Sequence, residues 1–169
     1  MLIIKIIIYT FIFLTTSAIG MLKAKKYVDR ANELREFKSA ISMFKTKLKY
    51  TYNPIQEIFT EITEKFQSNV GKVFKIASIN MQNKNASESW NLAIDLGPLN
   101  INDEDKSILK NMGNLLGQTD LAGQISQVEL TENFIDEQII KAEKERLKNE
   151  KLYRTLGMTA GMAIVIILL

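Results

Sequence analysis

Apolar and polar residues alternate along most of the chain with the period of an α-helix. In the segment LREFKSAISMFKTKL the apolar residues recur at steps of 3, 4, 3 and 4, which predicts one face of a packed helix. These residues are Leu34, Phe37, Ile41, Phe44 and Leu48. No Gly or Pro lies between Met21 and Asn53, so we expect this helix to continue unbroken from the apolar N-terminal segment.

A second helix is expected to begin at Pro54. Asn53 suits an N-cap, Pro54 suits the first helical position, and Gln56 completes a pattern similar to a capping box. Its apolar face consists of Ile55, Ile58, Phe59, Ile62 and Phe66. A soft break at Ser68-Asn69 separates it from a further helix, and together the two predict a helical hairpin.

Three more helix starts follow. Asn85 precedes a glutamate by three residues, Asn102 precedes three acids that suit the positive end of a helix dipole, and Thr119 opens the longest helix. Gly97-Pro98 ends the first of these helices, and Gly117 is the expected C-cap of the second. Strand-like alternation of useful length is absent from the sequence.

Uncharged segments occupy both ends of the chain. Residues 6–22 form a run of seventeen uncharged residues, which is near the lower limit for a helix that crosses the ~30 Å hydrocarbon core. A cleaved signal peptide is the alternative, but Ser17-Ala18 is a poor cleavage site and most positive charge follows the apolar run. The last fourteen residues, 156–169, are also uncharged and would rise about 21 Å as a helix. We expect a second, minimal span, whose alternative is a tail that lies in the interface or is buried in the domain.

Basic residues lie on the inner side of both apolar segments, which predicts that the central domain is cytoplasmic and both termini lie across the membrane. They are Lys23, Lys25, Lys26 and Arg30 after the first segment, and Arg146, Lys148, Lys151 and Arg154 before the last. The predicted fold class is therefore all-α: a helical-bundle soluble domain of about six helices between an N-terminal and a short C-terminal transmembrane helix. The predicted boundaries are 1–22 for the first span, 23–155 for the domain with a charged stalk near its end, and 156–169 for the second span.

Composition argues against most kinds of chemistry. The chain contains no His and no Cys, so imidazole catalysis, thiolate chemistry and metal sites with His or Cys ligands are excluded, and no nucleotide-binding loop occurs. The net charge of +3 forms no concentrated basic stripe, so nucleic acid is not expected as a partner. The acids 103–105 are interpreted as helix-start residues rather than as a cation site, and Asp95, Asp120 and Glu129 as scattered surface acids. We expect no enzyme activity, no cofactor and no metal.

A few residues stand out as candidates for interactions. Asp120 and Gln124 lie in a helix junction rich in Gly, Gln and Asp, where they either lock the junction to the neighbouring helix or contact a partner. Tyr153 and Arg154, just before the last apolar segment, are two further candidates for an interaction or a junction. Gly157 and Gly161 form a small-xxx-small pair that suits close packing on a neighbouring membrane helix, such as the first span. Trp90 is interpreted as a core residue, with a partner-docking anchor as the alternative.

The order and spacing of several segments resemble the stage III sporulation protein AB family. The segments are LLGQTDLAGQISQVELT, AEKERLKNEKLYRTLGMTAGMAIVIILL and LKYTYNPIQEIF. The matching positions in the first two are Leu116, Gly117, Asp120, Gln124, Tyr153, Arg154, Leu156, Gly157 and Gly161. A Gly that the family typically carries before the Pro is replaced here by Tyr52-Asn53, which affects only the shape of that turn. The resemblance covers essentially the whole chain.

The resemblance implies a function that periodicity cannot show. Members of this family belong to a channel complex between mother cell and forespore, and their soluble domain is similar to a cytoplasmic domain of the type II secretion platform protein F. The implied role is a scaffold in the mother-cell membrane that docks an ATPase and other membrane subunits of the channel, with homo-oligomerisation left open. The rival class is a two-anchor adaptor or sensor outside any secretion machine, which acts through coiled-coil pairing of the 141–154 stalk.

Overall fold

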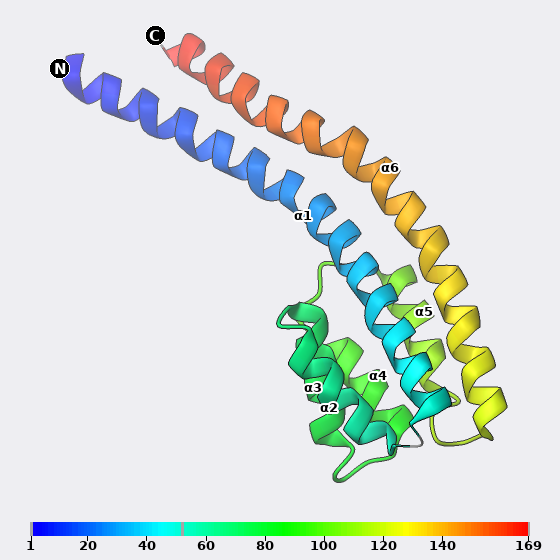
Figure 1. Cartoon of the computed structure of the whole chain (residues 1–169). Helices are drawn as coiled ribbons and strands as arrows, with labels where there is room; N and C mark the ends of the chain where they lie inside the picture. The colour runs from blue at the N-terminus through cyan, green and yellow to red at the C-terminus, as the bar shows by residue number, and fades with distance from the viewer. Residues whose placement is uncertain (1, 52, 169) are drawn as a thin grey trace. The chain divides into compact units, whose positions relative to one another are not determined.

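The protein is all-helical, as the sequence predicts. The computed structural model describes residues 2–51 and 53–168, with side chains from Ile4 onward, and these residues contain six helices and no strand (Figure 1). Tyr52, in the turn that departs from the family pattern, lies outside the described residues, as do Met1 and Leu169. The helices are α1 (Leu2–Tyr50), α2 (Ile55–Lys65), α3 (Asn69–Asn80), α4 (Ala86–Leu96), α5 (Asp103–Gly113) and α6 (Leu121–Leu168).

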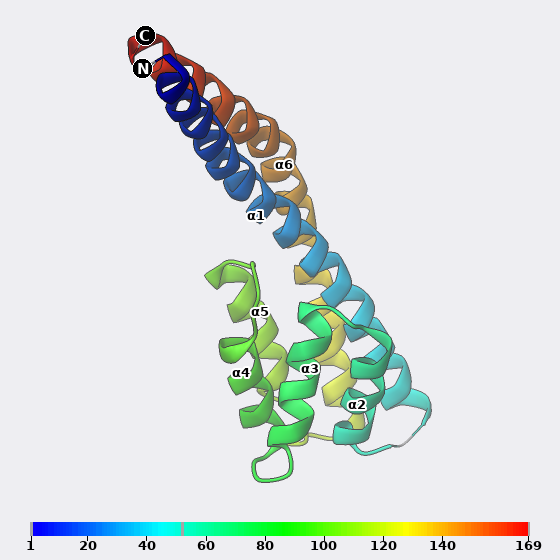
Figure 2. The same cartoon turned by 90° about the vertical axis from the view of Figure 1, so that its left-hand side faces the viewer.

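The chain divides into two compact units, and both divisions fall inside long helices. One unit contains residues 1–31 and 141–169, and the other contains residues 32–140. In the first unit the N-terminal part of α1 and the C-terminal part of α6 run side by side, with the two chain ends at the same end of the pair (Figures 1 and 2). The hydropathy boundaries at 22/23 and 155/156 remain predictions, because the compact units divide at other residues.

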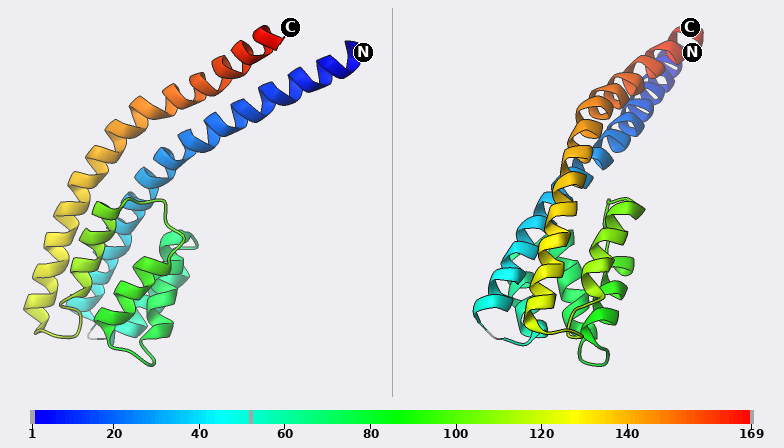
Figure 3. Two further views of the ribbon diagram at one scale, coloured as in Figure 1. Left: turned by 180° about the vertical axis from the view of Figure 1, so that it is seen from behind. Right: turned by 90° about the vertical axis from the view of Figure 1, so that its right-hand side faces the viewer.

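The second unit, residues 32–140, is the helical domain. Its four short helices α2 to α5 pack each against the next along the chain, beside the parts of α1 and α6 that belong to this unit (Figure 3). Local signals fix three of the helix starts. The side chains of Ser68 and Asn85 accept hydrogen bonds from the first turns of α3 and α4, and Asn102 forms a complete capping box with Asp105.

Three predicted helix boundaries are wrong: two starts and one C-terminal cap. Asn53 does not cap α2, because Pro54 has an extended backbone (ψ 143°), the helix begins at Ile55, and the Asn53 amide donates to Glu61 instead. Gly117 is not the C-cap of α5, which ends at Gly113; it adopts a positive φ of 70° in the turn that follows. Thr119 does not open α6, because the carboxylate of Asp120 accepts the Gly123 N–H (3.0 Å) and the helix begins one residue after Asp120.

The core of the domain is a chain of aromatic rings. Phe44 of α1 contacts Phe59 of α2, which contacts Phe74 of α3, and both Phe59 and Phe74 contact Trp90 of α4, with ring centroids 5.0–5.4 Å apart. All four side chains are fully buried. The indole N–H of Trp90 donates to the carbonyl of Leu109 in α5 (2.6 Å), so Trp90 is a core residue as predicted and not a docking anchor.

Ion pairs connect α1 to α6 within this domain. The Lys38 ammonium lies 2.5 Å from Asp136, and Lys45 pairs with Glu132 and, at 3.8 Å, with Glu129. The hydrogen bond to Glu132 raises the pKa of Lys45 above its ordinary value. Because these side chains are partly exposed, we expect each pair to contribute at most about 1 kcal/mol and mainly to set the register of the two helices.

The first prediction concerns the contact between α4 and α5. A Cβ atom on Gly113 would lie 2.5 Å from Cδ1 of the buried Trp90 ring. Gly to Ala normally stabilises a helix by about 1 kcal/mol, but overpacking a core costs about 1–3 kcal/mol, so we expect Gly113→Ala to lower the melting temperature by several degrees. Thermal unfolding of the full chain in detergent, followed by circular dichroism, measures this. Ser107→Ala, at an exposed position of α5, is the control and should not lower it; a higher melting temperature for Gly113→Ala would contradict the contact.

Candidate membrane anchor and interaction sites

The two ends of the chain carry the strongest functional signal. Both α1 and α6 contain windows long and apolar enough to cross a membrane, and only 6% and 11% of those windows is buried within the protein. Large apolar side chains on this helix pair are exposed, for example Ile7 at 62%, Phe11 at 68% and Ile167 at 83%. Exposed apolar side chains of this density favour an apolar environment such as the bilayer core. We therefore treat both helices as candidate membrane spans.

Glycines allow the two apolar helices to approach at backbone distance. A Cβ atom on Gly157 would lie 2.9 Å from Cα of Gly20 and 2.9 Å from the carbonyl oxygen of Thr16, and one on Gly20 would lie 2.6 Å from the carbonyl oxygen of Tyr153. Gly161 faces the same helix, where Thr16 and Phe13 leave no room for a side chain. Gly157 and Gly161 thus pack on the N-terminal helix, and Gly20 is the third member of the contact. Sequence reasoning missed Gly20, because it has no spaced glycine partner on its own helix.

An aromatic and charged layer continues this helix pair. The rings of Tyr27 and Tyr153 stack at 5.7 Å with an interplanar angle of 14°, and the Lys23 ammonium lies 5.8 Å from the centroid of Tyr153. The hydrogen bond with Tyr153 raises the pKa of Tyr27. The buried Arg30 side chain bonds Glu145 at 2.7 Å. Aromatic and basic residues at the end of an apolar helix are typical of a membrane interface.

Arg154 lies next to this layer but has a different neighbour. Its guanidinium bonds Glu150 on the same helix at 2.9 Å, and its side chain is 58% exposed. Of these two candidates, Tyr153 stacks on Tyr27 of the other helix, whereas the Arg154 guanidinium pairs within its own helix. Whether Arg154 contacts a partner stays a prediction.

Asp120 and Gln124 come together at the turn before α6. Asp120 caps the helix through the Gly123 N–H, while Gln124 accepts from the Gly117 N–H (3.2 Å) and donates to the Thr119 carbonyl (3.0 Å). Gln124 therefore closes the turn from both sides, and these bonds hold the turn that precedes α6. Locking to the neighbouring helix and a partner contact both stay predictions.

A buried carboxylate that the sequence did not single out connects α1 to the start of α3 and to the loop at Asn100. Glu33 accepts from the Asn69 side chain (3.1 Å) and from both the backbone N–H and the side chain of Asn100 (2.6 and 2.9 Å). One turn further, Glu36 accepts from the Ser68 hydroxyl at 2.6 Å. Charge-assisted bonds of this kind offset the cost of burying a carboxylate. No local pattern could have found them, since the partners lie 32 to 67 residues away in the chain.

Several of the acids considered for chemistry make structural contacts. Asp105 completes the capping box of α5, Glu104 accepts from Gln138 at 2.8 Å, and Asp95 pairs with Lys110 at 2.6 Å. Across residues 2–51 and 53–168, no three His, Cys, Asp or Glu side chains are grouped so that they could hold a metal ion.

The second prediction tests the glycine contact in the candidate spans. Because the chain has no Cys, a Tyr27→Cys and Tyr153→Cys pair can be joined selectively by a short bismaleimide in native membranes. Gly157→Leu should reduce the cross-linked fraction about tenfold, since a side chain there forces the backbones apart at a cost of roughly 1–3 kcal/mol. Met158→Leu changes an exposed neighbour and should leave the yield unchanged. Equal yields in the two variants would contradict the contact.

Comparisons with known proteins agree on one family. The family model described as Stage III sporulation protein AB matches residues 5–169. The stage III sporulation protein AB of Bacillus subtilis (strain 168) is 23% identical over 169 residues, covering 98% of this chain and 99% of that protein. A solved structure of a stage III sporulation protein AB has the same fold, with a TM-score of 0.67 at 18% identity over 71% of this chain and 98% of that one.

Proposed function

Because the chain belongs to the stage III sporulation protein AB family, we propose that it is a membrane platform subunit of the sporulation channel between mother cell and forespore. Its family gives it a role in sporulation, and its two candidate spans suggest that it acts at a membrane. The observation that carries the proposal is that both candidate spans belong to one helix pair with direct backbone contact at Gly20 and Gly157. A chain attached at both ends in this way suits a fixed support on which other subunits assemble.

We further propose that the helical domain lies in the mother-cell cytoplasm, beside the membrane around the forespore. The support is the charge asymmetry: Lys23, Lys25 and Lys26 follow the first apolar segment, and Lys148 and Lys151 precede the last. Basic residues near the ends of a span favour the cytoplasmic side. The Tyr27 and Tyr153 stack would then lie at the inner headgroup level.

The third prediction tests this orientation. Alkaline phosphatase, which is active only outside the cytoplasm, should be active when it is fused after Leu169, because the last apolar segment then crosses the membrane. The same enzyme inserted in the exposed turn at Lys84 should be silent, and a cytoplasmic reporter should give the reverse pattern at both sites. A silent C-terminal fusion combined with an active cytoplasmic reporter at that point would contradict the second crossing.

The platform role predicts that other components depend on this chain for their position. In this proposal the domain docks the ATPase of the stage III channel and contacts further membrane subunits, as the resemblance to the platform protein of type II secretion implies. The fourth prediction is that deleting the gene blocks spore formation after engulfment and releases the ATPase, tagged with a fluorescent protein, from the forespore membrane into the mother-cell cytoplasm. Re-expression of the full chain should restore both. Normal spores, or an ATPase that stays at the membrane, would contradict the platform role.

The rival function, pairing of stalks as a coiled coil, is less favoured by the side chains. Leu147 and Leu152 are the exposed apolar residues of the 141–154 segment, at 71% and 46%. Five residues apart, they point in directions that differ by about 140° around the helix and do not form a seam. The neighbouring Ala142 is already buried within the protein.

A further inference from the structure

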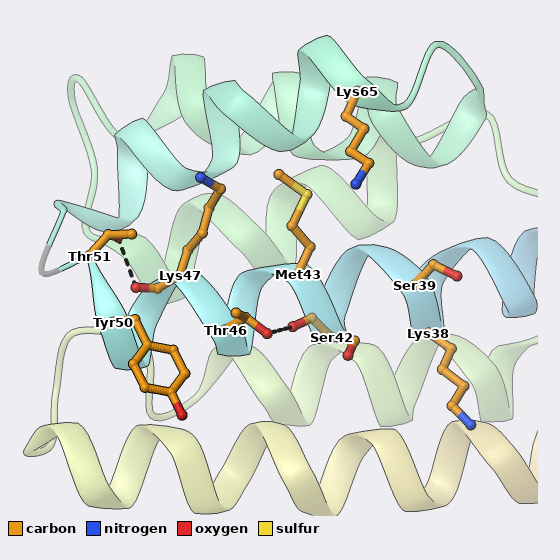
Figure 4. Close-up of a pocket in the computed structure, with 9 residues that line it drawn as sticks. All are labelled: Lys38, Ser39, Ser42, Met43, Thr46, Lys47, Tyr50, Thr51 and Lys65. Atoms are coloured by element: carbon orange, nitrogen blue, oxygen red, sulfur yellow. Dashed lines mark hydrogen bonds between the residues drawn. The ribbon is translucent and has the colours of Figure 1, made fainter.

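A groove on the helical domain is lined mainly by residues of α1 and α2, of which Lys38 also pairs with Asp136. It has a volume of about 740 Å³ and follows the exposed face of α1, with α2 on one side (Figure 4). All of its lining residues belong to the unit formed by residues 32–140. They are Lys38, Ser39, Ser42, Met43, Thr46, Lys47, Tyr50, Thr51 and Lys65.

The floor of the groove is one stripe of a helix. Ser39, Met43, Thr46 and Tyr50 recur at steps of 4, 3 and 4 and so share a face of α1 over about 16 Å, or three turns. The hydroxyl of Ser39 donates to the Arg35 carbonyl (3.1 Å) and that of Thr46 to the Ser42 carbonyl (2.9 Å). Because these hydroxyls are satisfied within their own helix, Ser39 and Thr46 present small, weakly polar surface next to the larger side chains of Met43 and Tyr50. A second helix could approach such a surface closely.

The sides of the groove carry positive charge only. Three lysines line it, and no Asp or Glu does. Lys38 and Lys47 pair with Asp136 and Glu61, which lie outside the groove. Lys65 is different: in the part of the chain that the structure describes, it has no hydrogen bond or ion pair, and its ammonium group extends over the groove toward α1 (Figure 4). An ammonium without a partner beside an open helical surface favours a carboxylate from another molecule.

We propose that this groove binds an acidic amphipathic helix of another protein. The apolar or small-residue face of that helix would lie on the floor against Met43 and Tyr50, and its Asp or Glu side chains would meet Lys65 and the exposed part of Lys38. Tyr50 is 68% exposed, and its ring supplies the kind of aromatic contact area that is common in binding surfaces. The proposal rests on the platform function and deepens it, because it assigns one docking surface and the chemistry of its occupant.

The fifth prediction uses a photo-cross-linking amino acid at Ser42, a lining residue beside the floor of the groove, in the full-length protein in sporulating cells. Mass spectrometry of the cross-linked product identifies the attached segment. We expect a segment of a different protein with helical apolar periodicity and an excess of Asp and Glu. Lys65→Glu should reduce the cross-link at least tenfold, and a Glu→Lys change in the attached segment should restore it. Lys84→Glu reverses an exposed charge away from the groove and should have no effect.

Each other outcome overturns the proposal. A cross-link to a second copy of this chain would make the groove a self-association surface, and a cross-link to lipid would make it a membrane contact. A basic or non-helical segment, or the same yield in Lys65→Glu and Lys84→Glu, would also contradict it. Thermal unfolding of both variants controls for loss of the fold, and Lys65→Met tests the same charge without introducing a new one. If no cross-link forms while the ATPase still depends on the chain for its membrane position, the groove assignment fails and the platform function stands.

Discussion

The helical domain depends on one chain of contacts between aromatic rings. Phe44, Phe59, Phe74 and Trp90 come from four successive helices, and the Trp90 N–H extends the chain to α5 through the Leu109 carbonyl. Ring pairs of this geometry contribute about 0.5–1.5 kcal/mol each beyond the area that they bury. Because these contacts join α1 to α5 in one core, we expect the domain to unfold cooperatively.

Polar contacts decide which helix faces are available for other molecules. Glu33 and Glu36 lie at the start of the part of α1 that belongs to the domain, and they accept hydrogen bonds from the start of α3 and from the loop at Asn100. Lys38 and Lys45, on the following turns of α1, form ion pairs with α6. The remaining face of α1, from Ser39 to Tyr50, is the floor of the groove. The helix therefore has structural contacts on its other faces and one open face, which is the arrangement that a docking surface on a scaffold needs.

The candidate membrane spans are held by a different kind of contact. Leucine and isoleucine gain little by packing on each other in lipid, so close backbone approach at small residues is the effective way to pair two spans. Gly20 and Gly157 supply that approach, and Tyr27, Tyr153 and the Arg30–Glu145 pair continue the contact along the helices. Packing of this kind can hold the candidate span in α6 against the one in α1.

The sequence by itself determined what depends on neighbouring residues. Periodicity predicted the helices, and Ser68-Asn69 marked the break before α3. Asn85 and Asn102 marked helix starts correctly, because a cap needs only backbone N–H groups within three residues. The same reasoning failed at Asn53 and Gly117, where turn geometry directed a side chain or the backbone elsewhere. Only the tertiary structure decided the role of Glu33, the contribution of Gly20 to the paired spans, and the groove at Lys65. Each of these joins atoms from segments that are far apart along the chain or leaves a surface uncovered, and the pattern along a single segment contains no information on which other segment will pack against it.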